Sequence, residues 1–239
     1  MIYSENYRTT WHDTDCRRIV RPTPILTYFE ETSNLHMISV GQPLDKIRDE
    51  AGLGFILSRL TIKFYKPLEM YKNIKVETWT SEGRAFSTLR SFRVYDGSEV
   101  AAEALTLWAL VDVNERKPVK ISSYDFGFEH EAPVEIDAPN RVAFPKDVEL
   151  VKVGERQIFY SDCDYNMHMN NTRYPDMLCD FLTDVKYGNL SSMTLSFVRE
   201  AAMGHTLSVY RAKKDENTYL FRTVDEDGNI CLEAEIVVK

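Results

Sequence analysis

The spacing of apolar residues predicts one amphipathic helix in each half of the chain. In the second half the apolar positions follow a helical period and are Tyr174, Met177, Leu178, Phe181, Leu182 and Val185. Asn171 or Thr172 is expected to cap this helix, and Gly188 follows its end. In the first half Thr23 is the expected cap and Pro24 the first helical residue. The inward face of that helix is predicted to carry Ile25, Tyr28, Phe29, Thr32 and His36.

Apolar and polar residues alternate through other segments, which is typical of strands with one buried face. One face of the first such strand carries Leu60, Ile62 and Phe64, and the other carries Thr61, Lys63 and Tyr65. Glu99–Val113 is apolar on both faces, as in a central strand. Asp96-Gly97 and Asp227-Gly228 are hairpin turn signals. Helices combined with long antiparallel strands predict the α+β class.

The two halves also resemble each other in residue order. Asp13-Thr14-Asp15 aligns with Asp162-Cys163-Asp164 at an offset of 149, and Leu57-Ser58 aligns with Leu190-Ser191 at an offset of 133. The offsets differ by 16 residues (149 against 133), which corresponds to an extra short helix over Pro43–Gly52 in the first copy. Its inward residues are expected to be Leu44, Ile47 and Ala51.

This repeat divides the chain into two modules and a connection. We predict a first module over 1–121, a linker over 122–149 and a second module over 150–239. The linker is rich in acidic residues and is interrupted by Pro133, Pro139 and Pro145, which is typical of a segment that crosses a surface.

Composition narrows the class of protein. The chain has 239 residues, and its net charge of -8 at pH 7 argues against a protein that binds nucleic acid over its whole surface. No apolar run approaches the ~18 residues of a membrane-spanning helix, and no secretory signal is visible. The four cysteines form no CxxC pair and match no zinc pattern. We therefore expect reduced thiols, no bound metal and a cytoplasmic location.

The segment Ser161–Asn171 holds the densest group of chemically useful side chains. Asp164, Asn166 and His168 alternate within it, immediately before the second predicted helix. In a straight strand Asp164 and His168 would lie ~13 Å apart, so they can act together only if the loop coils. A base, a carboxylate and an amide beside the N–H groups of a helix start near Asn171 suit acyl transfer. The alternative is that the acids and amides only form turns and cap the helix.

The first copy serves as an internal comparison. It keeps Asp15 opposite Asp164 but has Arg17 and Ile19 where the second copy has Asn166 and His168. A second difference is Glu200, because the first copy has Tyr65-Lys66-Pro67 at the matching segment. Glu200 could orient the imidazole or activate water, or it could form a surface ion pair of little energetic value. Cys163 and Cys179 lie near this site but are not expected to be nucleophiles. These differences favour one active site in each chain.

The Asp-x-Asn-x-His-x-Asn-Asn motif, followed about thirty residues later by Arg199-Glu200, resembles the acyl-acyl carrier protein thioesterases. The resemblance covers nearly the whole chain and implies a tandem double hotdog fold, in which each half is a long helix wrapped by an antiparallel sheet. It places the catalytic residues at Asp164, Asn166, His168 and Glu200. Plant members have cysteine at the position of Ala201, which argues against a thiol nucleophile here.

The resemblance also implies the reaction and its partner. A fatty acid would be released from the 4′-phosphopantetheine arm of acyl carrier protein. Either His168 and Glu200 would activate water for the attack, or Asp164 would attack first and water would then release the acyl-enzyme. The remaining alternative for Asp164 is that it only orients Asn166 and His168. No cofactor is needed, and the protein is expected to be a monomer or homodimer. Asn171 would lie at the thioester carbonyl, and the acyl chain would run against residues of the first copy. The candidates there are Ile25, Phe29, Leu57 and Leu60, with Ile38 and Trp108. The candidate carrier-docking residues are Arg17, Arg18 and Arg21, with Lys63 and Lys66.

Three other functions fit the same fold. An acyl-CoA thioesterase would use the same residues on a different thiol. A non-catalytic acyl-binding hotdog protein would bind the chain without cleaving it. Dehydration of hydroxyacyl chains is a further alternative. The preferred chain length and degree of saturation depend on a binding site whose depth the sequence does not give.

Overall fold

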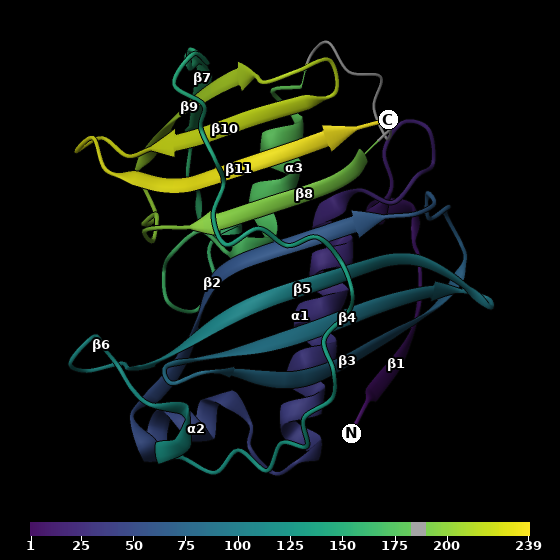
Figure 1. The fold of residues 1–239 in the computed structure, drawn as a ribbon, viewed down its shortest axis with the longest axis vertical. Helices are drawn as coiled ribbons and strands as arrows, with labels where there is room; N and C mark the ends of the chain where they lie inside the picture. Colours follow the sequence, from purple (N-terminus) through teal and green to yellow (C-terminus); the bar gives the residue numbers. More distant parts are fainter. Residues whose placement is uncertain (183–189) are drawn as a thin grey trace. The chain divides into compact units, whose positions relative to one another are not determined.

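The chain divides into two units, each of which contains a set of antiparallel strands (Figure 1). Unit 1 comprises Met1–Val20 and Pro24–Asp137, and unit 2 comprises Arg21–Thr23 and Ala138–Lys239. The computed structural model describes residues 1–182 and 190–239, so the predicted positions Val185 and Gly188 lie outside the described residues. Among the helices in these ranges, none is long and apolar enough to cross a membrane.

In unit 1 the strands follow the order β1-β3-β4-β5-β2, and every neighbouring pair is antiparallel. The long helix α1 crosses one face of this sheet (Figure 1). Its helices are α1 (Pro22–Ser39) and α2 (Leu44–Ala51), with the 3-10 turns η1 (Trp11–Asp13) and η2 (Ile121–Ser123). Its strands are β1 (Tyr3–Arg8), β2 (Leu53–Phe64), β3 (Asn73–Arg84), β4 (Ser87–Asp96), β5 (Glu99–Asp112) and β6 (Lys117–Pro118), of which β6 pairs with β5.

The interior of unit 1 confirms the predicted alternation. The α1 residues Ile25, Phe29, Thr32 and His36 are buried. Phe29 stacks on Phe92 of β4, with ring centroids 4.6 Å apart. In β2, Leu60 and Ile62 are buried while Lys63, and Tyr65 just after the strand, are exposed, but Thr61 on the same face as Lys63 is also buried. The strand β5 lies between β4 and β2, as its two apolar faces predict.

Two helix details in unit 1 differ from the prediction. α1 begins at Pro22, so Thr23 lies inside the first turn and is not its cap. Proline fits there because the first helical N–H groups have no partner within the helix. α2 buries Ile47 as expected, but Ala51 is exposed. The reason is that the helix ends at this residue and the chain turns away at Gly52, whose φ of +65° is left-handed.

Unit 2 repeats this arrangement with shorter elements. Its strands follow the order β8-β11-β10-β9-β7, again antiparallel throughout. They are β7 (Val151–Gln157), β8 (Leu190–Phe197), β9 (Thr206–Lys213), β10 (Thr218–Val224) and β11 (Ile230–Val238). Its helical elements are η3 (Tyr160–Asp162), η4 (Asn171–Arg173) and α3 (Tyr174–Cys179). The hairpins at Gly97 and Gly228, both with positive φ, join β4 to β5 and β10 to β11 as predicted.

The helix of unit 2 ends earlier than its apolar stripe suggests. Tyr174, Met177 and Leu178 are buried on α3 as predicted. The prediction that Phe181 and Leu182 continue the helix is wrong, because α3 ends at Cys179. The N–H groups of these two residues bond three positions back, to Leu178 O at 3.1 Å and Cys179 O at 3.0 Å. Such tight terminal turns stop an α-helix while leaving Leu182 buried.

The segment 122–149 contributes to the cores of both units. Within unit 1, Phe126 is buried in a cluster with Met37, Ile47, Leu53 and Leu110. The Trp79 Nε1–H donates to Ala132 O at 2.8 Å. Within unit 2, Val142 is buried against Ala212 and Leu220. The prolines and acids of this segment therefore alternate with apolar anchors that hold it on each unit.

His36 gives unit 1 a pH-sensitive interior. Burial, followed by the nearby charges of Arg90 and the N-terminal ammonium, lowers its pKa to about 4. A histidine held neutral in this way stabilises the fold fully above its unfolded pKa of ~6.5, and the contribution is lost as the pH falls toward 4.

As the pH is lowered from 6.5 to 4, the free energy of unfolding should decrease in both the wild type and His36→Gln. We expect the decrease to be larger in the wild type, by up to ~3 kcal/mol. Urea unfolding of both proteins across this range measures the difference. The use of the variant as reference removes the contribution of carboxylates that titrate in the same window. Equal pH dependence in the two proteins would contradict this assignment.

Candidate active site

The loop between η3 and η4 of unit 2 brings the predicted catalytic residues together. Its ends pair through a bridge between Cys163 and Met169. The Asp164 N–H donates to His168 O at 3.0 Å, and the Met167 N–H donates to Asp164 O at 3.0 Å. Met167 closes the turn with a φ of +65°. The loop therefore coils. Coiling is the arrangement that the spacing of Asp164 and His168 requires if the two residues are to act together.

A second segment, which follows β8, holds Glu200 beside this loop. The Met169 N–H donates to Ala201 O at 2.8 Å, and a further bridge pairs His168 with Ala202. These backbone contacts fix the relative position of the two segments. As a result His168 Nδ1 lies 3.4 Å from Glu200 Oε2. The side chain of His168 is 27% exposed and that of Glu200 is 54% exposed, so a substrate can reach both.

Unit 1 builds the same loop without the same chemistry. Its backbone bonds match those above and are Asp15 N–H to Ile19 O at 2.8 Å, Arg18 N–H to Asp15 O at 3.0 Å, and Val20 N–H to Leu68 O at 2.8 Å. Arg18 has the same φ of +65° as Met167. Yet Ile19 and Pro67 occupy the positions of His168 and Glu200. The coiled loop is thus part of the fold, whereas the histidine and glutamate are additions specific to unit 2.

The side chain of Asp164 stabilises the turn of its loop, and Asp15 does the same in unit 1. Asp164 Oδ1 accepts the Asn166 N–H at 2.8 Å, and Asp15 Oδ1 accepts the Arg17 N–H at 2.8 Å. Both are turns in which an aspartate side chain bonds to the backbone two residues on. Because both units use the carboxylate in this way, the turn is sufficient to explain why an aspartate stands at this position of the loop. The Asn166 side chain is exposed beside it.

The start of the following helix differs from the prediction. Asn170, not Asn171 or Thr172, is the cap, and its Oδ1 accepts the Thr172 N–H at 2.8 Å. The Arg173 N–H donates to Asn170 O at 2.9 Å. Two N–H groups that a helix start would offer to an oxyanion are therefore already bonded. The capping role of Asn170 could have been predicted from the sequence, because this residue stands just before a short polar turn that leads into Pro175.

The neighbouring cysteines are poorly suited to nucleophilic attack. Burial and the charges of Asp162 and Asp164 raise the pKa of the Cys163 thiol. Burial raises the pKa of Cys179 to about 12. A nucleophilic cysteine needs the opposite shift, because the thiolate is the reactive form.

The predicted chain-binding residues lie inside unit 1, with one exception. Ile25, Phe29, Leu57 and Leu60 are all buried there. Ile38 is 57% exposed, so its assignment to an interior site is wrong. It follows Met37, which faces the core, and the turn of the helix carries it outward. Trp108 is partly buried, and its Nε1–H donates to Thr106 Oγ1 at 2.9 Å.

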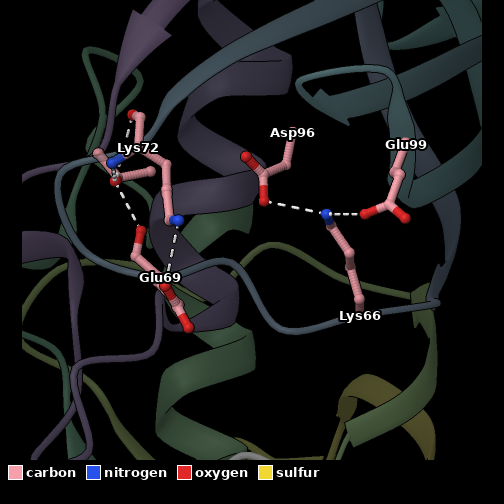
Figure 2. A network of polar contacts seen from close by, with 6 residues as sticks. Lys66, Glu69, Lys72, Asp96 and Glu99 are labelled. Atoms are coloured by element: carbon pink, nitrogen blue, oxygen red, sulfur yellow. Dashed lines mark hydrogen bonds and ion pairs between the residues drawn. The ribbon is translucent and has the colours of Figure 1, made fainter.

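Most of the predicted docking cations already have carboxylate partners. Arg17 pairs with Asp15 and Arg21 pairs with Asp176, each at 2.8 Å. Lys66 lies between two carboxylates, with its Nζ 3.0 Å from Asp96 and 2.6 Å from Glu99 (Figure 2). Lys63 is exposed, with its Nζ 5.4 Å from the centre of the Tyr65 ring. Arg18 is also exposed and takes part in none of the ion pairs found in residues 1–182 and 190–239.

His168 is accessible and lies beside the Glu200 carboxylate, an arrangement that suits acyl transfer. The chain matches the acyl-ACP thioesterase N-terminal domain over residues 1–125 and the acyl-ACP thioesterase C-terminal domain over residues 146–237. It therefore belongs to the acyl-acyl carrier protein (ACP) thioesterase family, and it hydrolyses the thioester of acyl-ACP.

Solved structures share the fold over the whole chain. An acyl-ACP thioesterase from Bacteroides thetaiotaomicron is 20% identical, with a TM-score of 0.90 over 100% of this chain and 98% of that one. The 12:0-ACP thioesterase from Umbellularia californica is 17% identical, with a TM-score of 0.88 over 100% of this chain and 97% of that one. The double hotdog fold predicted from the sequence is thereby confirmed. Comparison with curated proteins gave no match.

Proposed function

We propose that His168 is the general base of this thioesterase and that Glu200 orients it and stabilises its protonated form. The observation that carries the proposal is the 3.4 Å separation of His168 Nδ1 and Glu200 Oε2, which the backbone of two segments maintains. The matching positions of unit 1, Ile19 and Pro67, hold neither group on an otherwise equivalent loop.

The pairing sets the tautomer that the reaction needs. With its proton on Nδ1 facing Glu200, the imidazole presents the Nε2 lone pair to a water molecule. That water attacks the thioester carbonyl as His168 takes its proton, and the thiol of the phosphopantetheine arm leaves with a proton returned from the imidazolium. The products are a free fatty acid and the carrier thiol. A separation of 3.4 Å is longer than a strong hydrogen bond, and such contacts shorten when substrate binds.

In this mechanism Asp164 positions the loop, and water is the nucleophile. The carboxylate of Asp164 is bonded to the Asn166 N–H in the turn that unit 1 reproduces with Asp15. The exposed amide of Asn166 and the backbone N–H of Asn171 are the proposed donors to the oxyanion. The Thr172 and Arg173 N–H groups are excluded from that role because Asn170 holds them.

Substitution of Asp164 separates a positioning role from nucleophilic attack. We expect Asp164→Asn to keep kcat within about threefold of wild type, because asparagine forms the same turn. Asp164→Ala should lose about 10- to 100-fold, because the loop loses its side-chain bond and the reacting groups shift. Steady-state hydrolysis of acyl-ACP measures both. Asp15→Asn in unit 1 is the matched control. A nearly inactive Asp164→Asn enzyme that folds normally would show that the carboxylate itself attacks.

Docking of the carrier is proposed to involve Arg17, Arg18 and Arg21, and Arg18 contributes the charge that no described carboxylate neutralises. The chain-binding role of Ile25, Phe29, Leu57 and Leu60 is supported by their burial in unit 1. A cytoplasmic location and a monomeric or homodimeric state stay predictions.

A further inference from the structure

A charged arginine lies in the interior of unit 1. Arg90 is 6% exposed, and it shares the α1-facing side of β4 with Phe92. Its direct partners across the sheet are Thr80 of β3 and Thr106 of β5. Leu60 of β2 continues the same row, because it pairs with Thr106. Arg90 therefore lies on the interior face of the sheet that also carries Phe92 and Leu60.

None of the described residues that contact Arg90 carries a negative charge. Arg90 Nη1 lies 3.1 Å from His36 Nδ1 and 3.3 Å from Thr78 Oγ1, and Nη2 lies 3.7 Å from Met37 Sδ. The guanidinium carbon lies 5.6 Å from the centre of the Phe128 ring. Burial lowers the pKa of Arg90 to about 10, which leaves it charged at neutral pH, while His36 is neutral there. A buried charge without a counter-ion destabilises a fold by several kcal/mol.

The neighbouring Arg93 shows the ordinary arrangement on the same strand. Its side chain is 30% exposed, and its Nη2 lies 2.6 Å from Glu103. Glu103 of the neighbouring strand β5 therefore neutralises the arginine on the outer face of β4. Within residues 1–182 and 190–239, no carboxylate pairs with Arg90 on the inner face.

A second polar group beside Arg90 also has no partner. Thr80 is fully buried, and its Oγ1 makes no hydrogen bond to any described residue. Directly opposed residues of antiparallel strands place their Cβ atoms ~5 Å apart on one face. Thr80 and Arg90 thus lie on the same interior face of the sheet, where the described residues leave a hydroxyl without a hydrogen bond and a positive charge without a counter-ion.

We propose that Arg90, with Thr80 and His36, binds the carboxylate of an aliphatic chain inside unit 1. A carboxylate would supply the counter-ion that Arg90 does not have. Its two oxygens can accept hydrogen bonds from two N–H groups of the planar guanidinium at once. The tail of the ligand then contacts the apolar residues of the same interior, including Phe29 and Leu60. Two sources supply this chemistry, namely the free fatty acid that the enzyme releases and an acyl chain whose far end bears a carboxylate. The second source rests on the proposed role of these residues in binding the substrate chain.

Binding without turnover tests the first source. Isothermal titration calorimetry measures the affinity for laurate and for dodecanol. The proteins compared are His168→Ala alone, which serves as the reference, and the same protein with Arg90→Met or with the control substitution Arg93→Met. The His168→Ala background removes the hydrolytic base. We expect Arg90→Met to bind laurate at least tenfold more weakly, with dodecanol unchanged and Arg93→Met like the reference. Because no hydrolysis is involved, this result does not depend on the proposed catalytic mechanism.

Turnover with an otherwise unchanged active site tests the second source. Carrier protein loaded with the monothioester of dodecanedioic acid is compared with lauroyl carrier. Arg90→Met should lower kcat/KM at least tenfold for the first and little for the second. If Arg90→Met does not fold, both experiments are repeated with Thr80→Val and with Arg90→Lys. Each of these variants should show a smaller loss of laurate affinity and of kcat/KM for the dicarboxylic substrate.

Stability separates this role from a structural one. Removal of an unneutralised buried charge should leave the melting temperature of Arg90→Met equal to or above that of the wild type. The proposal is overturned if neither experiment shows discrimination that depends on Arg90. A positive result with laurate assigns a product site, and one with the dicarboxylic chain assigns a specificity site.

Discussion

Replacement of His168 with alanine is expected to lower kcat for acyl-ACP hydrolysis by roughly 10²- to 10⁴-fold, the range that a general base supplies. His168 is the imidazole on the coiled loop of unit 2, and Glu200 faces its Nδ1. Without it, water has no base to remove its proton as it attacks the carbonyl. The loop itself should survive, because its backbone bonds form equally around Ile19 in unit 1.

The control for this variant is His205→Ala. His205 is exposed in the same unit, and its backbone bonds to Ala202 and Ile158 belong to the scaffold of the site. Its side chain has no part in the mechanism, so kcat should stay near that of the wild type. Circular dichroism and thermal melting establish that both variants are folded. A folded His168→Ala enzyme with near-normal turnover would remove His168 from the mechanism.

Substitution of Glu200 with glutamine should reduce kcat by about 10²-fold. Glutamine keeps the shape of the side chain, but it offers no charge to stabilise the imidazolium that forms when water is deprotonated. Substrate affinity should change little, because the interaction strengthens mainly in the transition state. Measurement of kcat and KM separately distinguishes this loss from weaker binding.

Glu216→Gln is the matched control for Glu200. Glu216 lies in the exposed turn between β9 and β10, away from the loop that carries His168. It should behave as the wild type. If Glu200→Gln kept full kcat, the 3.4 Å contact would be an incidental surface pair of the kind that contributes little.

The local patterns in the sequence were sufficient for the main elements. The apolar spacing of α1 and β2 predicts which residues are buried, because period and burial are linked directly. The motif around Asp164, Asn166 and His168 predicts a coiled loop. The half-chain repeat is confirmed at the level of individual backbone bonds, since Asp15 and Asp164 form the same turn.

The features that sequence reasoning missed depend on backbone pairing, on chain ends or on burial in the folded unit. The sequence proposed Glu200 as a partner of the His168 imidazole, but it did not reveal the bridge between His168 and Ala202 that holds the two segments together. The end of α3 at Cys179 results from tight terminal turns that an apolar stripe does not reveal. Arg90 had a visible signal, because it interrupts the inward series Thr88, Phe92 and Val94. Its burial without a counter-ion is nevertheless a property of the folded unit.

The most direct test of the catalytic account is a double-mutant cycle on His168→Ala and Glu200→Gln, measured as kcat/KM for acyl-ACP hydrolysis. If Glu200 acts through the imidazole, its substitution should cost little once His168 is gone. The double variant should then be within about threefold of His168→Ala. If the two losses instead multiply, each side chain acts independently, and the proposed pair does not form the catalytic unit.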